Sequence, residues 1–236
     1  MNPAILSSRL GGLFPPDTVA AELRAPGNPD LLLPAEAAKL GRAVLQRVQE
    51  FTAGRLCARR ALAEFGIVDF PIRVGDDRQP VWPDLMIGSI THTAGFCAAA
   101  VVERRGVAAV GLDSEVVGDV KPKIWSRICV PREIEWVRSL PAPEQAAAVT
   151  LIFSAKEAFY KCQYAVVRER LNFADVTVEA AGWGGSDGMF EIHATRNMAI
   201  AQRTALPMQG RYLFHDVLVS AGIAIARGAV AAEPAQ

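Results

Sequence analysis

The order of helical and extended segments restricts the fold of this 236-residue chain more than any other feature. The stretch Ala35–Phe65 lacks proline, repeats apolar residues at helical spacing and is followed by Gly66, so it predicts one long helix with Gly54 as its weak point. A second long helix carries residues Ile152–Tyr164. Short extended segments follow each helix, at 70–74, 80–82, 86–91, 96–102 and 107–113 after the first, and at 174–179, 189–194, 210–214 and 217–226 after the second.

This order predicts an α+β fold of two similar halves, each with a long helix packed on a small antiparallel sheet. We place the halves at residues 1–110 and 111–236 and expect them to meet near residues 105–120. Residues 1–34 are rich in proline and glycine, which predicts an irregular segment with one short strand near Thr18–Leu23 and no chemistry. The glycine-rich run 182–188 lacks the following helix of a nucleotide-binding loop and is interpreted as a hairpin turn.

The charge balance argues against a nucleic-acid or membrane partner. The chain has 25 basic and 25 acidic residues, whereas binding to nucleic acid or to anionic membranes usually requires a basic excess. No apolar run reaches membrane-spanning length, and no secretory leader is evident. The four cysteines are widely spaced, so we expect them to be reduced and buried. A cytoplasmic protein is the expectation.

The second helix combines charged and aromatic residues on one face. At about 100° per residue, five side chains fall within roughly a quarter of the helix circumference, and this face is expected to point inward. They are Phe153, Glu157, Tyr160, Lys161 and Tyr164.

The first helix is rich in arginine. Arg47, Arg55 and Arg59 lie within roughly a third of its circumference, and Arg55 falls on the apolar side. Two interpretations stay open: these side chains extend to solvent or pair with internal carboxylates, or they form an anion site that faces the core.

The segment Ser89–Gly95 leaves a strand and enters a turn. It contains Thr91, His92 and Thr93, which suit either a capped turn or a phosphate contact made by hydroxyl and imidazole groups. His193 and His215 lie in predicted strands without partners at metal-ligand spacing, and both are interpreted as structural.

Two carboxylates end a buried strand. In an extended strand Asp113 and Glu115 point to the same face about 7 Å apart, with Ser114 on the other face. The pair could be a solvated strand end, but like charges on one face also suit a bound cation, and the end of a buried strand is a frequent ligand position.

Together with Glu157, this pair supplies three oxygen ligands for a hard divalent cation such as Mg²⁺. Several basic groups, Arg47, Arg55, His92, Lys156 and Lys161, would add anion binding around the metal. A carboxylate-bound metal beside anion-binding groups indicates chemistry on a polyphosphate ester.

At this point the motifs resemble a known family. The paired signature of the 4'-phosphopantetheinyl transferases, Gly-(Ile/Leu/Val)-Asp-x-Glu and (Phe/Trp)-x-x-Lys-Glu-(Ala/Ser)-x-x-Lys, is similar to Gly111-Leu112-Asp113-Ser114-Glu115 and to Phe153-Ser154-Ala155-Lys156-Glu157-Ala158-Phe159-Tyr160-Lys161. Segments 50–59, 80–83 and 88–92 resemble the branch of enterobactin synthase component D, so the resemblance spans roughly residues 40–175.

The resemblance implies an enzyme that acts as a monomer and whose single chain forms a pseudo-dimer of two similar halves. It would transfer 4'-phosphopantetheine from coenzyme A to a serine of an apo acyl or peptidyl carrier protein and release adenosine 3',5'-bisphosphate. Asp113, Glu115 and Glu157 would hold Mg²⁺ against the diphosphate, and Glu157 would also be the best candidate for general base. Lys161 would contact the transferring phosphate or assist the leaving group. The nucleotide, chiefly its 3'-phosphate, would be held by Arg47, Arg55, Thr91, His92 and Thr93.

Two other functions stay open at this point: a non-catalytic module that binds coenzyme A or a carrier protein, and a metal-dependent nucleotide phosphohydrolase. The resemblance does not say whether the carrier protein belongs to fatty-acid, polyketide, nonribosomal-peptide or siderophore biosynthesis.

Overall fold

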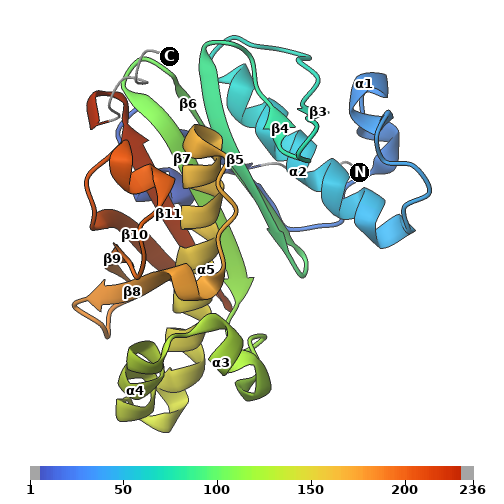
Figure 1. Cartoon of the computed structure of the whole chain (residues 1–236). Coiled ribbons are helices and arrows are strands. Elements are labelled where there is room, and N and C mark those ends of the chain that lie inside the picture. The colour runs from blue at the N-terminus through green and yellow to red at the C-terminus, as the bar shows by residue number, and fades with distance from the viewer. Residues whose placement is uncertain (1–5, 230–236) are drawn as a thin grey trace. The chain divides into compact units, whose positions relative to one another are not determined.

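The computed structural model describes residues 6–229, and the chain divides into two compact units with their boundary between Arg105 and Gly106. Each unit has its own antiparallel sheet and its own long helix (Figure 1). The α+β fold class expected from the sequence is therefore confirmed. The pseudo-dimeric relation between the halves stays a prediction.

The first unit is built on a four-stranded sheet in the order β1-β2-β6-β5. Its strands are β1 (Leu6–Ser7), β2 (Val19–Leu23), β5 (Met86–Thr93) and β6 (Phe96–Glu103). All residues of β6 except the last are buried. Helix α2 (Leu45–Ala63) packs on β2 and β6 through small side chains and covers the face that carries Cys97, Ala99 and Val101. The buried residues of α2 include Ala53, Cys57, Ala58 and Ala61.

The first long helix is shorter than the sequence predicts. Only a short helix, α1 (Pro34–Ala37), forms before the chain turns at Gly41, whose φ of +56° favours glycine. Val44, one of the apolar residues at helical spacing, is 73% exposed. The predicted helix is too long because an exposed apolar residue can match the helical period without being part of the core.

Gly54 is a packing position and not the weak point that we expected. It lies in the middle of α2, and a β-carbon there would come within 2.8 Å of Cγ2 of Ile90 in β5. Glycine therefore permits the close approach of helix and strand.

The remaining elements of the first unit connect these parts. The predicted strand near Thr18–Leu23 is β2, but the leader is less irregular than expected, since Leu10 and Leu13 are buried. The short segments are η1 (Arg9–Leu13), η2 (Pro29–Leu31) and the two-stranded pair β3 (Arg73–Val74) and β4 (Pro80–Val81).

The second unit carries a five-stranded sheet in the order β7-β11-β10-β9-β8. Its strands are β7 (Val107–Val116), β8 (Val176–Ala181), β9 (Asp187–Ala194), β10 (Met208–His215) and β11 (Leu218–Ala226). Helix α5 (Ala142–Val167) packs along β7 and β11 (Figure 1). A β-carbon on Gly111 would lie 1.9 Å from the carbonyl oxygen of Ala158, so only glycine allows this contact between β7 and α5.

Shorter helices complete the second unit. They are η3 (Pro122–Ile124), α3 (Trp125–Ile128), α4 (Pro131–Ser139), η4 (Phe173–Asp175), η5 (Ala199–Gln202) and η6 (Arg227–Ala229). The predicted helix near Arg132 is α4, and the run 182–188 joins β8 and β9 as the expected hairpin.

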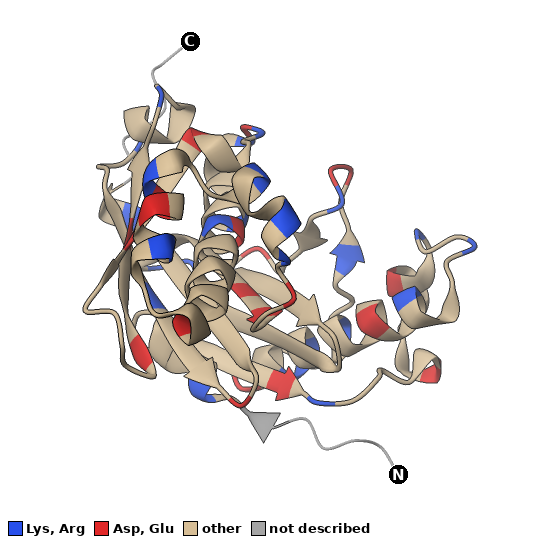
Figure 2. Ribbon diagram, turned by 90° about the horizontal axis from the view of Figure 1, so that it is seen from below, with Lys and Arg blue, Asp and Glu red and all other residues tan. Residues whose placement is uncertain are grey.

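Two whole-chain expectations can be compared with the structure. All four cysteines are free and buried, as predicted. Acidic and basic residues are distributed over both units (Figure 2), in line with the balanced charge of the sequence. Within residues 6–229, none of the helices combines the length and apolar character needed to cross a membrane.

Candidate functional site

Strand β7 presents its two carboxylates as the sequence predicts. Asp113 is buried and Glu115 is half-buried, and the regular pairing with β11 places both on the same face. Ser114 points to the other face, where its Oγ lies 2.7 Å from Oγ of its register partner Ser220. The side chain of Ser114 is therefore directed away from the carboxylates.

Helix α5 brings a lysine and a third carboxylate to Asp113. The Nζ of Lys161 donates to Oδ1 of Asp113 at 2.7 Å and to the carbonyl oxygen of Leu112 at 3.0 Å. The pKa of Glu157 is raised above its ordinary value by burial and then by the charge of Asp113, while Lys161 acts in the opposite direction. Asp113, Glu157 and Lys161 thus form one electrostatically coupled cluster in the second unit.

The charged face of α5 is only partly buried, although Phe153 packs against the core of this unit. Its five residues, from Phe153 to Tyr164, are all half-buried. A neighbouring stripe of fully buried apolar side chains at helical spacing belongs to the core. This stripe comprises Ala148, Leu151, Ile152, Ala155, Ala158, Phe159 and Cys162.

Lys156 is not an anion-binding group. Its Nζ donates at 2.8 Å to Oε2 of Glu133, at 2.9 Å to the carbonyl oxygen of Ile128 and at 2.8 Å to that of Phe173. Both charged side chains are 1% exposed. An ammonium group has three donors, so all of them are used inside the protein.

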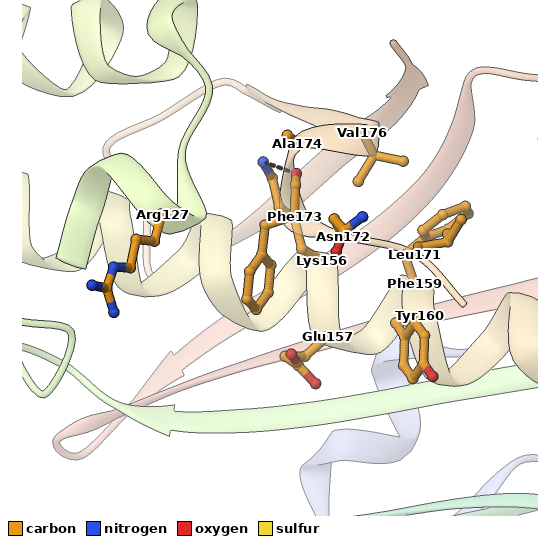
Figure 3. Close-up of a pocket in the computed structure, with 10 residues that line it drawn as sticks. All are labelled: Arg127, Lys156, Glu157, Phe159, Tyr160, Leu171, Asn172, Phe173, Ala174 and Val176. Atoms are coloured by element: carbon orange, nitrogen blue, oxygen red, sulfur yellow. Dashed lines mark hydrogen bonds between the residues drawn. The ribbon is translucent and has the colours of Figure 1, made fainter. Parts of the chain in front are cut away.

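A pocket of about 350 Å³ opens beside the carboxylate of Glu157 within the second unit. Figure 3 shows Glu157 and Tyr160 extending from one side of α5, whereas Lys156 extends from the other toward Phe173. The pocket is lined by Arg127, Lys156, Glu157, Phe159, Tyr160, Leu171, Asn172, Phe173, Ala174 and Val176. Mostly apolar walls with a few polar groups are typical of a small-molecule site.

The sequence analysis did not identify this pocket. Its wall from Leu171 to Ala174 comes from the segment after α5, which carries no motif, and Arg127 comes from α3. The proximity of these segments depends on the tertiary fold, and in the sequence only the interrupted helix pattern after Val167 marks the turn.

In the first unit, two of the predicted nucleotide-binding residues contact each other. Nη1 of Arg47 lies 2.9 Å from Nε2 of His92, an interaction that requires Nε2 to be the acceptor. Arg47 is exposed and also lies 3.7 Å from the carboxylate of Glu50. His92 at the end of β5 is exposed as well, so Arg47 and His92 form an exposed pair between the start of α2 and the end of β5.

Arg55 is less accessible than Arg47. Its guanidinium is buried 3.8 Å above the ring of Phe51, and its Nε donates to the carbonyl oxygen of Ile72 at 3.1 Å. Burial lowers the pKa of Arg55 to about 10, against the opposing charge of Glu36. The pairing interpretation holds for Arg59, whose guanidinium contacts the buried Glu36 at 2.7 Å.

The two threonines beside His92 differ in burial: Thr91 is buried and Thr93 is half-buried. Among residues 6–229, no group of three or more His, Cys, Asp or Glu side chains is arranged so that it could hold a metal ion. The metal role of the predicted trio, Asp113, Glu115 and Glu157, therefore stays a prediction.

Comparison with known proteins decides the family. The sequence matches the 4'-phosphopantetheinyl transferase N-terminal domain over residues 35–102 and the 4'-phosphopantetheinyl transferase superfamily over residues 109–205, together more than half of the chain. The chain belongs to the 4'-phosphopantetheinyl transferases. The resemblance inferred from the motifs is confirmed, and with it the enzyme class, which transfers the 4'-phosphopantetheine group to carrier proteins.

Individual relatives support the same assignment. The 4'-phosphopantetheinyl transferase Svp of Streptomyces mobaraensis is 34% identical over 214 residues, which cover 89% of this chain and 85% of the relative. The transferase PptT of Mycobacterium tuberculosis is 38% identical over 159 residues, 65% of this chain and 69% of the relative. Enterobactin synthase component D of Escherichia coli K12 is 38% identical over 134 residues, 56% of this chain and 62% of the relative.

Proposed function

We propose that this transferase takes the 4'-phosphopantetheine group from coenzyme A in a Mg²⁺-dependent reaction and attaches it to a serine hydroxyl of an apo acyl or peptidyl carrier protein. The observation that carries the proposal is the cluster of Asp113, Glu157 and Lys161 beside the pocket, in a chain of this family. The by-product is adenosine 3',5'-bisphosphate.

The chemistry of the carboxylates fits a magnesium ion. Asp113, Glu115 and Glu157 offer only oxygen donors, which Mg²⁺ prefers, and it usually keeps positions open for phosphate oxygens. The pKa of Glu157 is raised first by burial and then by the charge of Asp113, and a divalent cation would relieve that repulsion. We assign these three residues as the ligands; when bound, the ion would neutralise charge on the diphosphate.

We assign the nucleotide portion of coenzyme A to residues of the first unit. The exposed pair Arg47 and His92, with Thr93, offers donors for the 3'-phosphate. Arg55 and Thr91 are buried, so we assign them an indirect part in nucleotide binding. Arg55 would contribute the positive charge of its buried guanidinium.

We assign the pantetheine arm to the pocket beside Glu157. The arm leaves the diphosphate at the phosphate that is transferred, so a groove that begins at the metal-binding carboxylate is a suitable place for it. The pocket offers apolar contacts from Leu171 and Phe173 and polar groups from Tyr160 and Asn172.

The reaction needs one proton acceptor and no protein nucleophile. The serine oxygen of the carrier forms a bond to the phosphorus of the pantetheine phosphate, and the bond from that phosphorus to the bridging oxygen of the diphosphate breaks. We assign Glu157 as the acceptor of the serine proton, because its carboxylate borders the pocket that is assigned to the pantetheine arm. Lys161, released from Asp113, supplies positive charge to the leaving phosphate.

One experiment separates this proposal from the alternatives. The protein is incubated with Mg²⁺, coenzyme A and an apo carrier protein, and the mass of the carrier is measured. A mass gain of one phosphopantetheine supports transfer. Release of the bisphosphate without a carrier would favour a phosphohydrolase, and coenzyme A binding without either product would favour a binding module.

Two further assignments follow from the same proposal. We place the enzyme in the cytoplasm, since its four free thiols suit a reducing compartment and it acts on carrier proteins. We also infer that it acts as a monomer, which light scattering after size-exclusion chromatography would check.

A further inference from the structure

One wall of the pocket is a short segment that follows helix α5. Four of its residues line the pocket, namely Leu171, Asn172, Phe173 and Ala174. The segment leaves α5 at Arg168, which has a positive φ of +57°, and reaches β8 at Val176. Glu169 and Asp175 therefore lie at the two ends of this wall.

A single arginine on the next loop joins the two ends. Arg196, which follows β9, donates through Nη1 to Oε1 of Glu169 at 2.9 Å. Its Nε and Nη2 contact the two oxygens of Asp175 at 3.0 and 3.1 Å, which is a bidentate arrangement. The pKa of Asp175 is lowered, chiefly by this hydrogen bond to Arg196.

The same carboxylates also accept backbone donors. The second oxygen of Glu169 accepts the backbone N–H of Ala199 at 2.7 Å, and Oδ2 of Asp175 accepts that of Asn172 at 2.8 Å. The group of Arg196, Glu169 and Asp175, here called the clamp, therefore ties the wall to the loop that follows β9 and also fixes the turn inside the wall.

The inner side of the wall is held independently. Lys156 donates to the carbonyl oxygen of Phe173 at 2.8 Å, and Gln163 donates to that of Glu169 at 2.8 Å. Both donors come from the buried side of α5. Removing the clamp should thus loosen the wall without unfolding it, because the inner contacts persist.

We propose that Arg196 is a positioning residue for the transfer reaction: together with Glu169 and Asp175 it holds the pocket wall in place and so sets the affinity for the pantetheine arm of coenzyme A. This inference rests on the proposed placement of the arm in the pocket. A wall that is already ordered loses less conformational entropy when the ligand binds, so the clamp favours binding without a contact to the ligand.

The test compares two ligands that differ by the arm. Calorimetry measures binding of coenzyme A and of adenosine 3'-phosphate 5'-diphosphate, which keeps the diphosphate and lacks pantetheine, to wild type and to Arg196→Gln. We expect the variant to bind coenzyme A about fivefold more weakly, because the pocket wall is less ordered without the clamp, with the affinity for the ligand without the arm unchanged. The KM for coenzyme A should rise by a similar factor, with kcat within about twofold of wild type.

Matched variants give the controls. Arg60→Gln removes an arginine of similar exposure, 41% against 40%, from an ion pair with Glu64 in the first unit, and should leave both affinities unchanged. Asp175→Asn should reproduce the effect of Arg196→Gln, while Arg196→Lys should restore part of it. In a variant that already carries Glu169→Gln and Asp175→Asn, the further change Arg196→Gln should lower the affinity for coenzyme A only slightly.

The outcomes are distinguishable. Unchanged coenzyme A affinity in both Arg196→Gln and Asp175→Asn would overturn the role of the clamp, and so would an equal loss for the two ligands. If wild type binds adenosine 3'-phosphate 5'-diphosphate and coenzyme A equally well, the pocket does not take the arm, and this inference fails. If wild type does not modify a carrier protein, the proposed function fails before the variants are compared.

Discussion

Replacing Lys156 by methionine tests the buried ion pair that holds α5 to its surroundings. Lys156 and Glu133 are each 1% exposed, and the ammonium is 2.8 Å from the carboxylate. Removing one partner of such a pair costs about 3–5 kcal/mol, because the other charge stays buried. Here Glu133 would keep the backbone donors of Val130 and Val178, each at 2.7 Å, so we expect the lower end, about 3 kcal/mol.

The assay is urea unfolding followed by tryptophan fluorescence, to which Trp125, Trp136 and Trp183 of the second unit contribute. Lys121→Met is the control, because this lysine is 62% exposed and lies 3.8 Å from Asp119; it should change stability by less than about 0.5 kcal/mol. Adding Glu133→Gln to Lys156→Met should cost less than the sum of the two single changes. A loss below about 1 kcal/mol for Lys156→Met would refute the reasoning, since that is the size expected of a solvated pair.

Three other changes test the site and its support. Glu157→Gln should abolish transfer to a carrier protein. Because the pKa of Glu157 is raised in the folded state, the stability of wild type should fall as pH rises from the unfolded pKa through the folded pKa. Thermal unfolding in EDTA should show that the Glu157→Gln variant lacks this fall. Arg55→Ala should weaken binding of coenzyme A more than that of 3'-dephospho-coenzyme A, and an equal loss in calorimetry would make Arg55 purely structural. Gly111→Ala should lower the melting temperature strongly, because its methyl group would lie 1.9 Å from the carbonyl oxygen of Ala158, and an unchanged value would contradict that contact.

Local patterns were sufficient for much of the fold. The strands of both units and the hairpin at 182–188 follow from alternation and turn residues within short windows. Asp113 and Glu157 could be paired because each belongs to a motif of a known family. The predicted beginning of the first helix was wrong, because Val44 matches the helical period although it is exposed and precedes α2.

Features that depend on distant segments were not predictable. Glu133, the partner of Lys156, lies 23 residues away on another helix, so the sequence suggested an anion-binding lysine where the protein has a buried pair. The pocket wall and Arg196 carry no motif, and they come together only because β8 and β9 pair. Burial of long-range polar pairs is a property of tertiary packing and leaves no periodic signal.

The three bonds of Lys156 also determine the rotational setting of α5. Its ammonium can reach Glu133, Ile128 and Phe173 in only one orientation of the helix about its axis. Glu157 is the next residue and is therefore directed about 100° away, to the side that carries the pocket. Inserting one residue between them would turn Glu157 by a further 100°, so the adjacency of the two residues links the anchoring of the helix to the direction of its carboxylate.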